Sequence, residues 1–232
     1  MSRIGIIGAM DEEVDILKQE MVVKEIKNIA NMDFYIGILE GKDIVLVRCG
    51  IGKVNAAVCT QVLIGQLEVT AVINTGVAGA VHEALEVLDV VISTEVQQHD
   101  FDVTGFGYGI GEIPRMETSV FKASEDLVDK AYRATGKVLK DQNIFKGKIV
   151  SGDVFVSSTA LKDRLQDVFQ AYCTEMEGAA IGQTCYLNQV PFVIIRAMSD
   201  KADGSAHANF NEFVEVASQH SKEIVMHMLS QM

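Results

Sequence analysis

The chain has 232 residues, of which 48% are hydrophobic and 22% charged, a composition typical of a globular protein. Its 32 acidic and 20 basic residues give a net charge of −12, which disfavours binding to nucleic acid or to an anionic membrane. Small neutral or zwitterionic ligands remain compatible with this charge. Four widely spaced cysteines lie in apolar stretches, which predicts buried, reduced thiols in a cytoplasmic protein.

Short β-branched runs recur along the chain, and several are continuous rather than alternating, as expected for strands covered on both faces. The predicted strands are residues 4–7, 35–39, 44–47, 71–74, 87–92, 148–150 and 192–195. Amphipathic helices are predicted between and after them, at residues 12–21, 54–67, 126–139, 177–187 and 210–232. This alternation predicts an α/β fold with a central mixed β-sheet flanked by helices, and residues 1–232 are expected to form a single domain.

Glycines follow several of the predicted strands, at Gly8, Gly52, Gly79 and Gly152. Small residues there allow a ligand to approach the backbone, so their recurrence favours a shared cleft at one edge of the sheet. Tight strand-to-helix turns are the alternative explanation for each of them. None forms a dinucleotide fingerprint or a P-loop. Residues 99–119 form a long, glycine-rich irregular region, which is typical of a functional loop or a partner contact.

Several short segments, in this order along the chain, together resemble a known family. They are GIIGAMDEE at residues 5–13, NTGVAG at 74–79, HDFDVT at 99–104, VSGDVF at 150–155, EME at 175–177 and RAMSD at 196–200. The set is similar to the 5′-methylthioadenosine/S-adenosylhomocysteine nucleosidases of the purine nucleoside phosphorylase superfamily. The likeness runs from residue 3 to about residue 213. Each segment alone is a weak signal, whereas the ordered set is specific.

This resemblance implies a nucleoside phosphorylase-like three-layer α/β/α fold and an N-glycosidase that works without a cofactor. The expected reaction is hydrolysis of methylthioadenosine and S-adenosylhomocysteine, with 5′-deoxyadenosine as a further substrate, in methionine salvage and the removal of adenosylmethionine by-products. Breaking this bond leaves positive charge on the ribose and negative charge on adenine, and it requires a nucleophilic water. A carboxylate that takes a proton from water and a carboxylic acid that protonates the base suit this chemistry.

The resemblance assigns Glu13 as the general base and Asp200 as the acid that protonates adenine N7, with the neighbouring Ser199 able to orient it. An acid in this role needs a raised pKa or a proton gained when substrate binds. Without the resemblance, Glu13 would be read as an acidic residue favoured by the dipole of a helix N-terminus. Asp200 would be read as a turn or cap residue after a buried strand.

Glu177 matches the family's ribose-binding carboxylate, which also faces the developing ribosyl cation. The alternative is an acid at the start of the helix predicted from residue 177, and this is the role expected for Glu175, whose side chain should point elsewhere. Arg196 matches an arginine near the water and the sugar. Alone, it would be read as the partner of a carboxylate.

The resemblance implies further substrate contacts. Phe155 should stack on adenine, and Val156 should bond the base through its backbone. Other substrate-binding positions are Gly79, Met10, Ile51, Met176 and Phe210. The four apolar side chains among them would be core residues on composition alone. The family often has a polar residue, commonly Ser, where this chain has Val77, so a hydroxyl contact to the water or the ribose is missing here.

The resemblance also implies a homodimer. Val103, Phe106 and Pro114 should cover the 5′-thio pocket of the neighbouring subunit. Three other functions stay open: a phosphorylase that uses phosphate in place of water, a nucleosidase for another 6-amino purine conjugate such as aminodeoxyfutalosine, and a non-catalytic nucleoside-binding protein. The grouping of His99, Asp100 and Asp102 suggests a metal site, but no further ligand is placed beside them, so no metal is expected.

Overall fold

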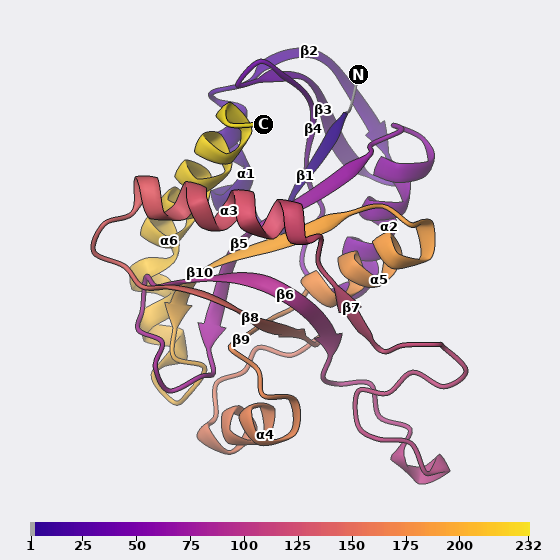
Figure 1. Cartoon of the computed structure of the whole chain (residues 1–232), viewed down its shortest axis with the longest axis vertical. Coiled ribbons are helices and arrows are strands. Elements are labelled where there is room, and N and C mark those ends of the chain that lie inside the picture. Colours follow the sequence, from indigo (N-terminus) through magenta and orange to yellow (C-terminus); the bar gives the residue numbers. More distant parts are fainter. Residues whose placement is uncertain (1–2) are drawn as a thin grey trace.

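The structure is a computed structural model that describes residues 3–232, and it has one mixed β-sheet at its centre (Figure 1). The strands are β1 (Ile4–Gly8), β2 (Val22–Ile29), β3 (Met32–Leu39), β4 (Lys42–Arg48), β5 (Ala71–Ala80), β6 (Val90–Gln98), β7 (Val120–Lys122), β8 (Ile144–Ser151), β9 (Cys173–Glu175) and β10 (Phe192–Asp200). β4, β1, β5 and β10 lie side by side in parallel, so their carboxyl ends meet at one edge. β2, β3 and β4 form an antiparallel meander.

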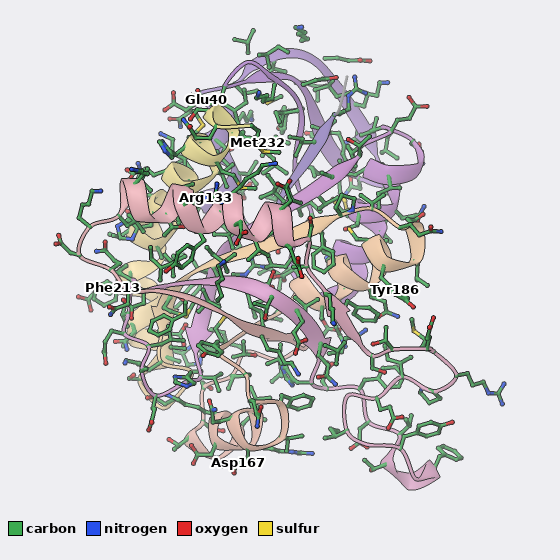
Figure 2. All side chains as sticks on the ribbon, viewed as in Figure 1. Glu40, Arg133, Asp167, Tyr186, Phe213 and Met232 are labelled. Carbon is green, nitrogen blue, oxygen red and sulfur yellow. The ribbon has the colours of Figure 1, made fainter. Side chains whose placement is uncertain are left out.

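Helices cover both faces of this sheet. They are α1 (Asp11–Lys18), α2 (Lys53–Gly65), α3 (Glu125–Val138), α4 (Thr159–Phe169), α5 (Gly178–Asn188) and α6 (Ala206–Ser230). α2 packs against α5 on one side, and α6 packs against α1 and α3 on the other (Figure 1). In Figure 2, Tyr186 on α5 and Phe213 on α6 accordingly lie on opposite sides of the molecule. The predicted α/β fold with a mixed, helix-flanked sheet is confirmed.

Five of the strands form a closed circuit, which the sequence pattern does not reveal. β5 pairs with β10, β10 with β6, β6 with β8, β8 with β9, and β9 returns to β5. All ten residues of β5 and all nine of β10 are buried. The carboxyl end of β5 is therefore paired on both sides, by β10 and β9, and the carboxyl end of β10 is paired with β5, which makes these strand ends rigid supports for a site.

Several elements differ from the sequence expectation. β2 was not predicted because nearly all of its residues are exposed and several are charged, and β9 has only three residues. α4 also went unpredicted, α6 begins at Ala206 rather than residue 210, and β6 begins at Val90 rather than residue 87. The first two residues of the predicted domain, 1–2, lie outside the described residues. Among residues 3–232, no helix is both long and apolar enough to span a bilayer.

Candidate active site

A pocket opens where the carboxyl ends of the parallel strands meet. Most of the sequence-predicted site residues line it, namely Met10, Glu13, Ile51, Gly79, Phe155, Met176, Glu177, Ser199, Asp200 and Phe210. Val156 lines a smaller adjoining pocket that Asp200 also borders. These residues come from segments almost 200 positions apart in the sequence, and the fold brings them together.

Glu13 lies in the first turn of α1, but its side chain points inward and is only 5% exposed. The backbone N–H groups of Ala9 and Met10 donate to its Oε2 at 2.6 and 3.1 Å, and that of Val77 donates to Oε1 at 3.1 Å. Burial raises the pKa of Glu13, although Arg196 and these three N–H groups oppose the rise. The carboxylate is thus fixed in place and has the higher basicity that a general base needs.

Gly76 on β5 makes room for this carboxylate. A Cβ atom at Gly76 would lie 2.2 Å from Oε1 of Glu13, closer than any side chain allows. By contrast Asp11 and Glu12, the other acids of the first turn, are exposed. Those two fit the helix-dipole interpretation, whereas Glu13 faces the pocket.

Asp200 ends β10, is buried and lines the pocket. Ser199 Oγ donates to its Oδ2 at 2.9 Å, and the N–H of Ala202 donates to its Oδ1 at 2.8 Å. Burial raises the pKa of Asp200, while these two hydrogen bonds act in the opposite direction. A raised pKa makes the protonated acid more accessible, as the protonation of a leaving group requires. A Cβ atom at Gly79 would lie 2.8 Å from Oδ1, so glycine preserves the space beside this carboxyl group.

Glu177 precedes α5 and is the third buried carboxyl group of the pocket. The N–H of Gly52 donates to its Oε1 at 2.8 Å. Burial, together with the negative charge of Glu175, raises the pKa of Glu177 to about 8 against the opposing charge of Arg196. A positive charge that develops on a ligand beside Glu177 would therefore find a poorly solvated carboxylate, where attraction is strongest.

Glu175 is among the residues that border the pocket, but its buried side-chain oxygens accept hydrogen bonds from protein groups, in keeping with the expectation that this side chain is directed elsewhere. It accepts from the N–H of Gly178 at the start of α5, as expected of a helix N-terminal acid. It is also ion-paired with Arg196. The physical reason is that Arg196 is only 2% exposed, and a buried guanidinium requires a counter-charge.

Arg196 lies behind the pocket wall rather than among the residues that line it. Its Nη2 donates to Glu175 and, at 2.6 Å, to Oδ1 of Asn74, whose amide in turn donates to the carbonyl of Ile7. Ser151 Oγ also donates to Glu175. Sequence reasoning missed this role of Asn74, although an arginine and an asparagine inside apolar strands are a signal that buried partners exist.

The rest of the pocket is apolar. Phe155 is 39% exposed, and its ring lies edge-on to that of Phe210 with centroids 6.0 Å apart. The side chain of Phe155 is thus available to stack on a planar ligand. Met10, Ile51 and Met176 complete this wall. Val77 lines the pocket with an aliphatic side chain, and its backbone N–H is used by Glu13.

Val103, Phe106 and Pro114 do not line the pocket of their own chain. They lie on the loop between β6 and β7, which contains the short 3₁₀ helix Thr104–Phe106 and extends away from the sheet (Figure 1). Phe106 is 85% exposed. Within residues 3–232, no group of three or more His, Cys, Asp or Glu side chains is arranged to hold a metal ion.

The chain belongs to the phosphorylase superfamily, whose family model matches residues 3–230. Within it, the chain is 46% identical over 227 residues to a 5′-methylthioadenosine/S-adenosylhomocysteine nucleosidase of Halalkalibacterium halodurans, covering 97% of both chains.

Two solved structures are similar to this chain over its whole length. The enzyme of this name from Neisseria meningitidis, in complex with methylthio-immucillin-A, matches with a TM-score of 0.95 and 39% identity, covering 100% of both chains. A futalosine hydrolase of Helicobacter pylori matches with a TM-score of 0.94 and 31% identity, covering 100% of this chain and 98% of the other. The resemblance seen in the sequence segments therefore extends over the whole chain.

Proposed function

We propose that the chain hydrolyses the N-glycosidic bond of 5′-methylthioadenosine and S-adenosylhomocysteine, releasing adenine and the 5′-thio-substituted ribose. The observation that carries this proposal is a pocket that combines an apolar wall with three buried carboxyl groups, those of Glu13, Glu177 and Asp200, in addition to that of Glu175, which is ion-paired with Arg196. Each of the three has a raised pKa. The Halalkalibacterium halodurans relative, which matches 97% of the chain, and the Neisseria meningitidis structure, which matches all of it, carry the name of this activity.

In the proposed reaction, adenine lies against Phe155, with Asp200 beside N7. Asp200 gives its proton to N7 as the bond between C1′ and N9 breaks, so that adenine leaves as a neutral molecule. Glu177 accepts hydrogen bonds from the ribose hydroxyls and stabilises the positive charge that grows on the sugar. Glu13 takes a proton from water while the water oxygen bonds to C1′. Arg196 acts through Glu175 and Asn74, since its guanidinium holds these side chains.

Water rather than phosphate is the nucleophile in this proposal. Glu13, Glu175 and Glu177 border the pocket, and Arg196 is the cation closest to them in the described hydrogen-bond network. A bound phosphate would be repelled by these carboxylates. The side chain of Val77 also offers no hydroxyl group that could donate a hydrogen bond to it. A non-catalytic nucleoside-binding protein is disfavoured because binding alone does not need three buried carboxyl groups, each of which is costly to bury.

A second substrate class has a specific observation in its favour. The similarity to a futalosine hydrolase makes a 6-amino purine conjugate such as aminodeoxyfutalosine an alternative substrate on the same machinery. The two classes share adenine and ribose and differ in the 5′ substituent. Met10, Ile51, Met176 and Phe210 offer an apolar surface for that end, which favours a thioether, because methionine sulfur and aromatic rings pack well against sulfur.

Release of the free purine base from a small substrate panel, which is hypoxanthine for inosine and adenine for the others, tests this function. The panel contains methylthioadenosine, S-adenosylhomocysteine, 5′-deoxyadenosine, aminodeoxyfutalosine and inosine. We expect release from the first three, with the thioethers best, and none from inosine. If aminodeoxyfutalosine is turned over fastest, the second substrate class is the correct one. If no member of the panel is cleaved, the proposal is contradicted.

For the cellular setting, we place the protein in the cytoplasm, in methionine salvage and in the disposal of adenosylmethionine by-products. The four cysteines are free and buried, as suits a reducing compartment. No cofactor takes part in the proposed reaction. We also treat residues 1–232 as one domain.

The active assembly in this proposal is a homodimer in which Val103, Phe106 and Pro114 of each subunit cover the 5′-thio end of the other subunit's pocket. Exposed apolar side chains lie on α2, α5 and the adjoining loops: Ile51, Val54, Val58, Phe106 and Leu187. Figure 1 shows these elements on one side of the molecule. Such a gathering is typical of a protein interface, and two-fold pairing would use both loops equally.

Sedimentation tests this assembly. Wild type is expected to be a dimer at micromolar concentration, whereas Phe106→Asp should weaken the dimer and raise KM for methylthioadenosine more than kcat falls. Val168→Asp, an exposed apolar residue on α4 outside this surface, is the matched control and should remain dimeric. A fully active wild-type monomer would contradict the proposal.

A further inference from the structure

Three residues from distant segments form a closed ring of hydrogen bonds beside the pocket, through their side chains and two backbone N–H groups. Lys53 Nζ donates to Asp100 Oδ1 at 2.6 Å, the N–H of Asp153 donates to Asp100 Oδ2 at 2.9 Å, and the N–H of Lys53 donates to Asp153 Oδ1 at 2.8 Å. Gln98 adds a further acceptor for Lys53 Nζ at 3.0 Å. We call Lys53, Asp100 and Asp153 the loop latch. It joins the loops that follow β4, β6 and β8.

The loop latch touches the pocket through its immediate neighbours in the chain. Gly52, directly before Lys53, donates its N–H to Glu177 Oε1 at 2.8 Å. Ile51 lines the pocket on the other side of Gly52, and Phe155 lies two residues after Asp153. The latch therefore connects the loop that supplies the hydrogen bond of Glu177 with the loop that carries the exposed ring of Phe155.

The local sequence explains why a distant residue caps the N-terminus of α2. Gly52 is the N-cap residue of α2 and has no side chain to accept from the first N–H groups of the helix. Its φ of +99° is a conformation that favours glycine, so a capping side chain is not an option here. Asp153, 100 residues further along the chain, supplies the accepting carboxylate and a negative charge at the positive end of the helix.

We propose that the loop latch positions the site for the reaction, with Lys53 as the positioning residue that holds Gly52 against Glu177 and fixes the loop carrying Phe155. This inference rests on the proposed function. Without the ammonium group of Lys53, the Asp100 carboxylate loses its ion pair, and the two loops are no longer joined by that ion pair. Displacement of reacting groups by about 1 Å can cost on the order of 10²-fold in rate.

The hydrogen bond from Gly52 also favours the ionised form of Glu177. The groups facing Glu177 are Glu175 and Glu13, which oppose ionisation, and Arg196, which promotes it, with the thiol of Cys49 nearby. Glu177 accepts from the sugar hydroxyls in the proposed reaction and so acts when ionised. Weakening the bond from Gly52 should therefore move the acidic limb of the kcat/KM profile to higher pH.

Lys53→Met tests the proposal, with Lys148→Met as the matched control. Lys148 pairs with Glu95 at 3.0 Å, and the side chains of that pair are 20% and 29% exposed, against 17% and 27% for Lys53 and Asp100. Partly exposed ion pairs such as these contribute modestly to global stability, so neither variant should unfold. Should Lys53→Met fail to fold, Asp100→Asn takes its place, because it removes the charge and keeps an acceptor.

We expect Lys53→Met to lower kcat/KM for methylthioadenosine by ~10–10²-fold, to shift the acidic limb to higher pH and to speed amide hydrogen exchange at Gly52. Lys148→Met should leave all three unchanged, and Lys53→Arg should restore most of the activity. Unchanged exchange at Gly52, or a loss of activity no larger than that of Lys148→Met, would overturn the proposal. Exchange at Gly52 needs no substrate. If the wild-type protein cleaves none of the substrates, only the proposed function is contradicted. Exchange at Gly52 then still tests whether the loop latch holds this residue in place.

Discussion

Replacing Asp200 by Asn is expected to slow adenine release from methylthioadenosine by ~10²–10⁴-fold. Adenine is a poor anionic leaving group, so its departure depends on a proton at N7. Asparagine preserves the size of the side chain and can still bond Ser199 and the N–H of Ala202, but it cannot deliver the proton. Steady-state kinetics, with thermal unfolding as a check on folding, measures the effect.

A substrate analogue with a leaving group that departs readily as an anion provides the control, because such a group needs no acid. Its cleavage should be much less affected by Asp200→Asn than cleavage of methylthioadenosine. Equal slowing of both substrates would mean that Asp200 positions the ligand or supports the pocket, and the assignment of the acid would be wrong.

Glu13→Gln should lower turnover of both substrates by at least ~10²-fold, since both need an activated water. Glutamine fills the same space, and its amide oxygen in the place of Oε2 can still accept hydrogen bonds from the N–H groups of Ala9 and Met10, but it cannot take a proton from water. Affinity for an unreactive substrate analogue, measured by calorimetry, should change little.

Glu12→Gln is the matched control for this substitution. It makes the same chemical change one residue earlier in the first turn of α1, on an exposed side chain. Its turnover should equal that of wild type. If Glu13→Gln were as active as Glu12→Gln, then Glu13 would be no more than a dipole-favoured acid at the start of a helix.

The fold class could be predicted from the sequence because the signals that define it are local. Continuous apolar strands such as β1 and β5 alternate with helices, and glycines mark the strand ends. The closure of β5, β10, β6, β8 and β9 into a circuit depends on pairings between distant segments, which no local pattern encodes. β2 carries charged, exposed residues on an edge strand and so lacks the apolar signal of a buried strand.

The candidate site likewise contains residues that the sequence could predict and residues that it could not. Glu13 follows β1, Glu177 precedes α5 and Asp200 ends β10. The sequence marks these three elements clearly, and the family resemblance singles out the three residues. The role of Glu175 as the partner of Arg196 depends on the packing of β9 beside the core, and a three-residue strand gives no sequence signal. The loop latch joins positions 47 and 100 residues apart, which only the folded chain brings into contact.

In the proposed reaction, water activated by Glu13 attacks the ribose. Identification of the sugar product from methylthioadenosine, with and without inorganic phosphate, distinguishes this step from attack by phosphate. We predict free methylthioribose in both cases, at a rate that does not depend on phosphate, because Glu13, Glu175 and Glu177 leave no favourable place for an anion. Methylthioribose-1-phosphate as the main product when phosphate is present would contradict the account.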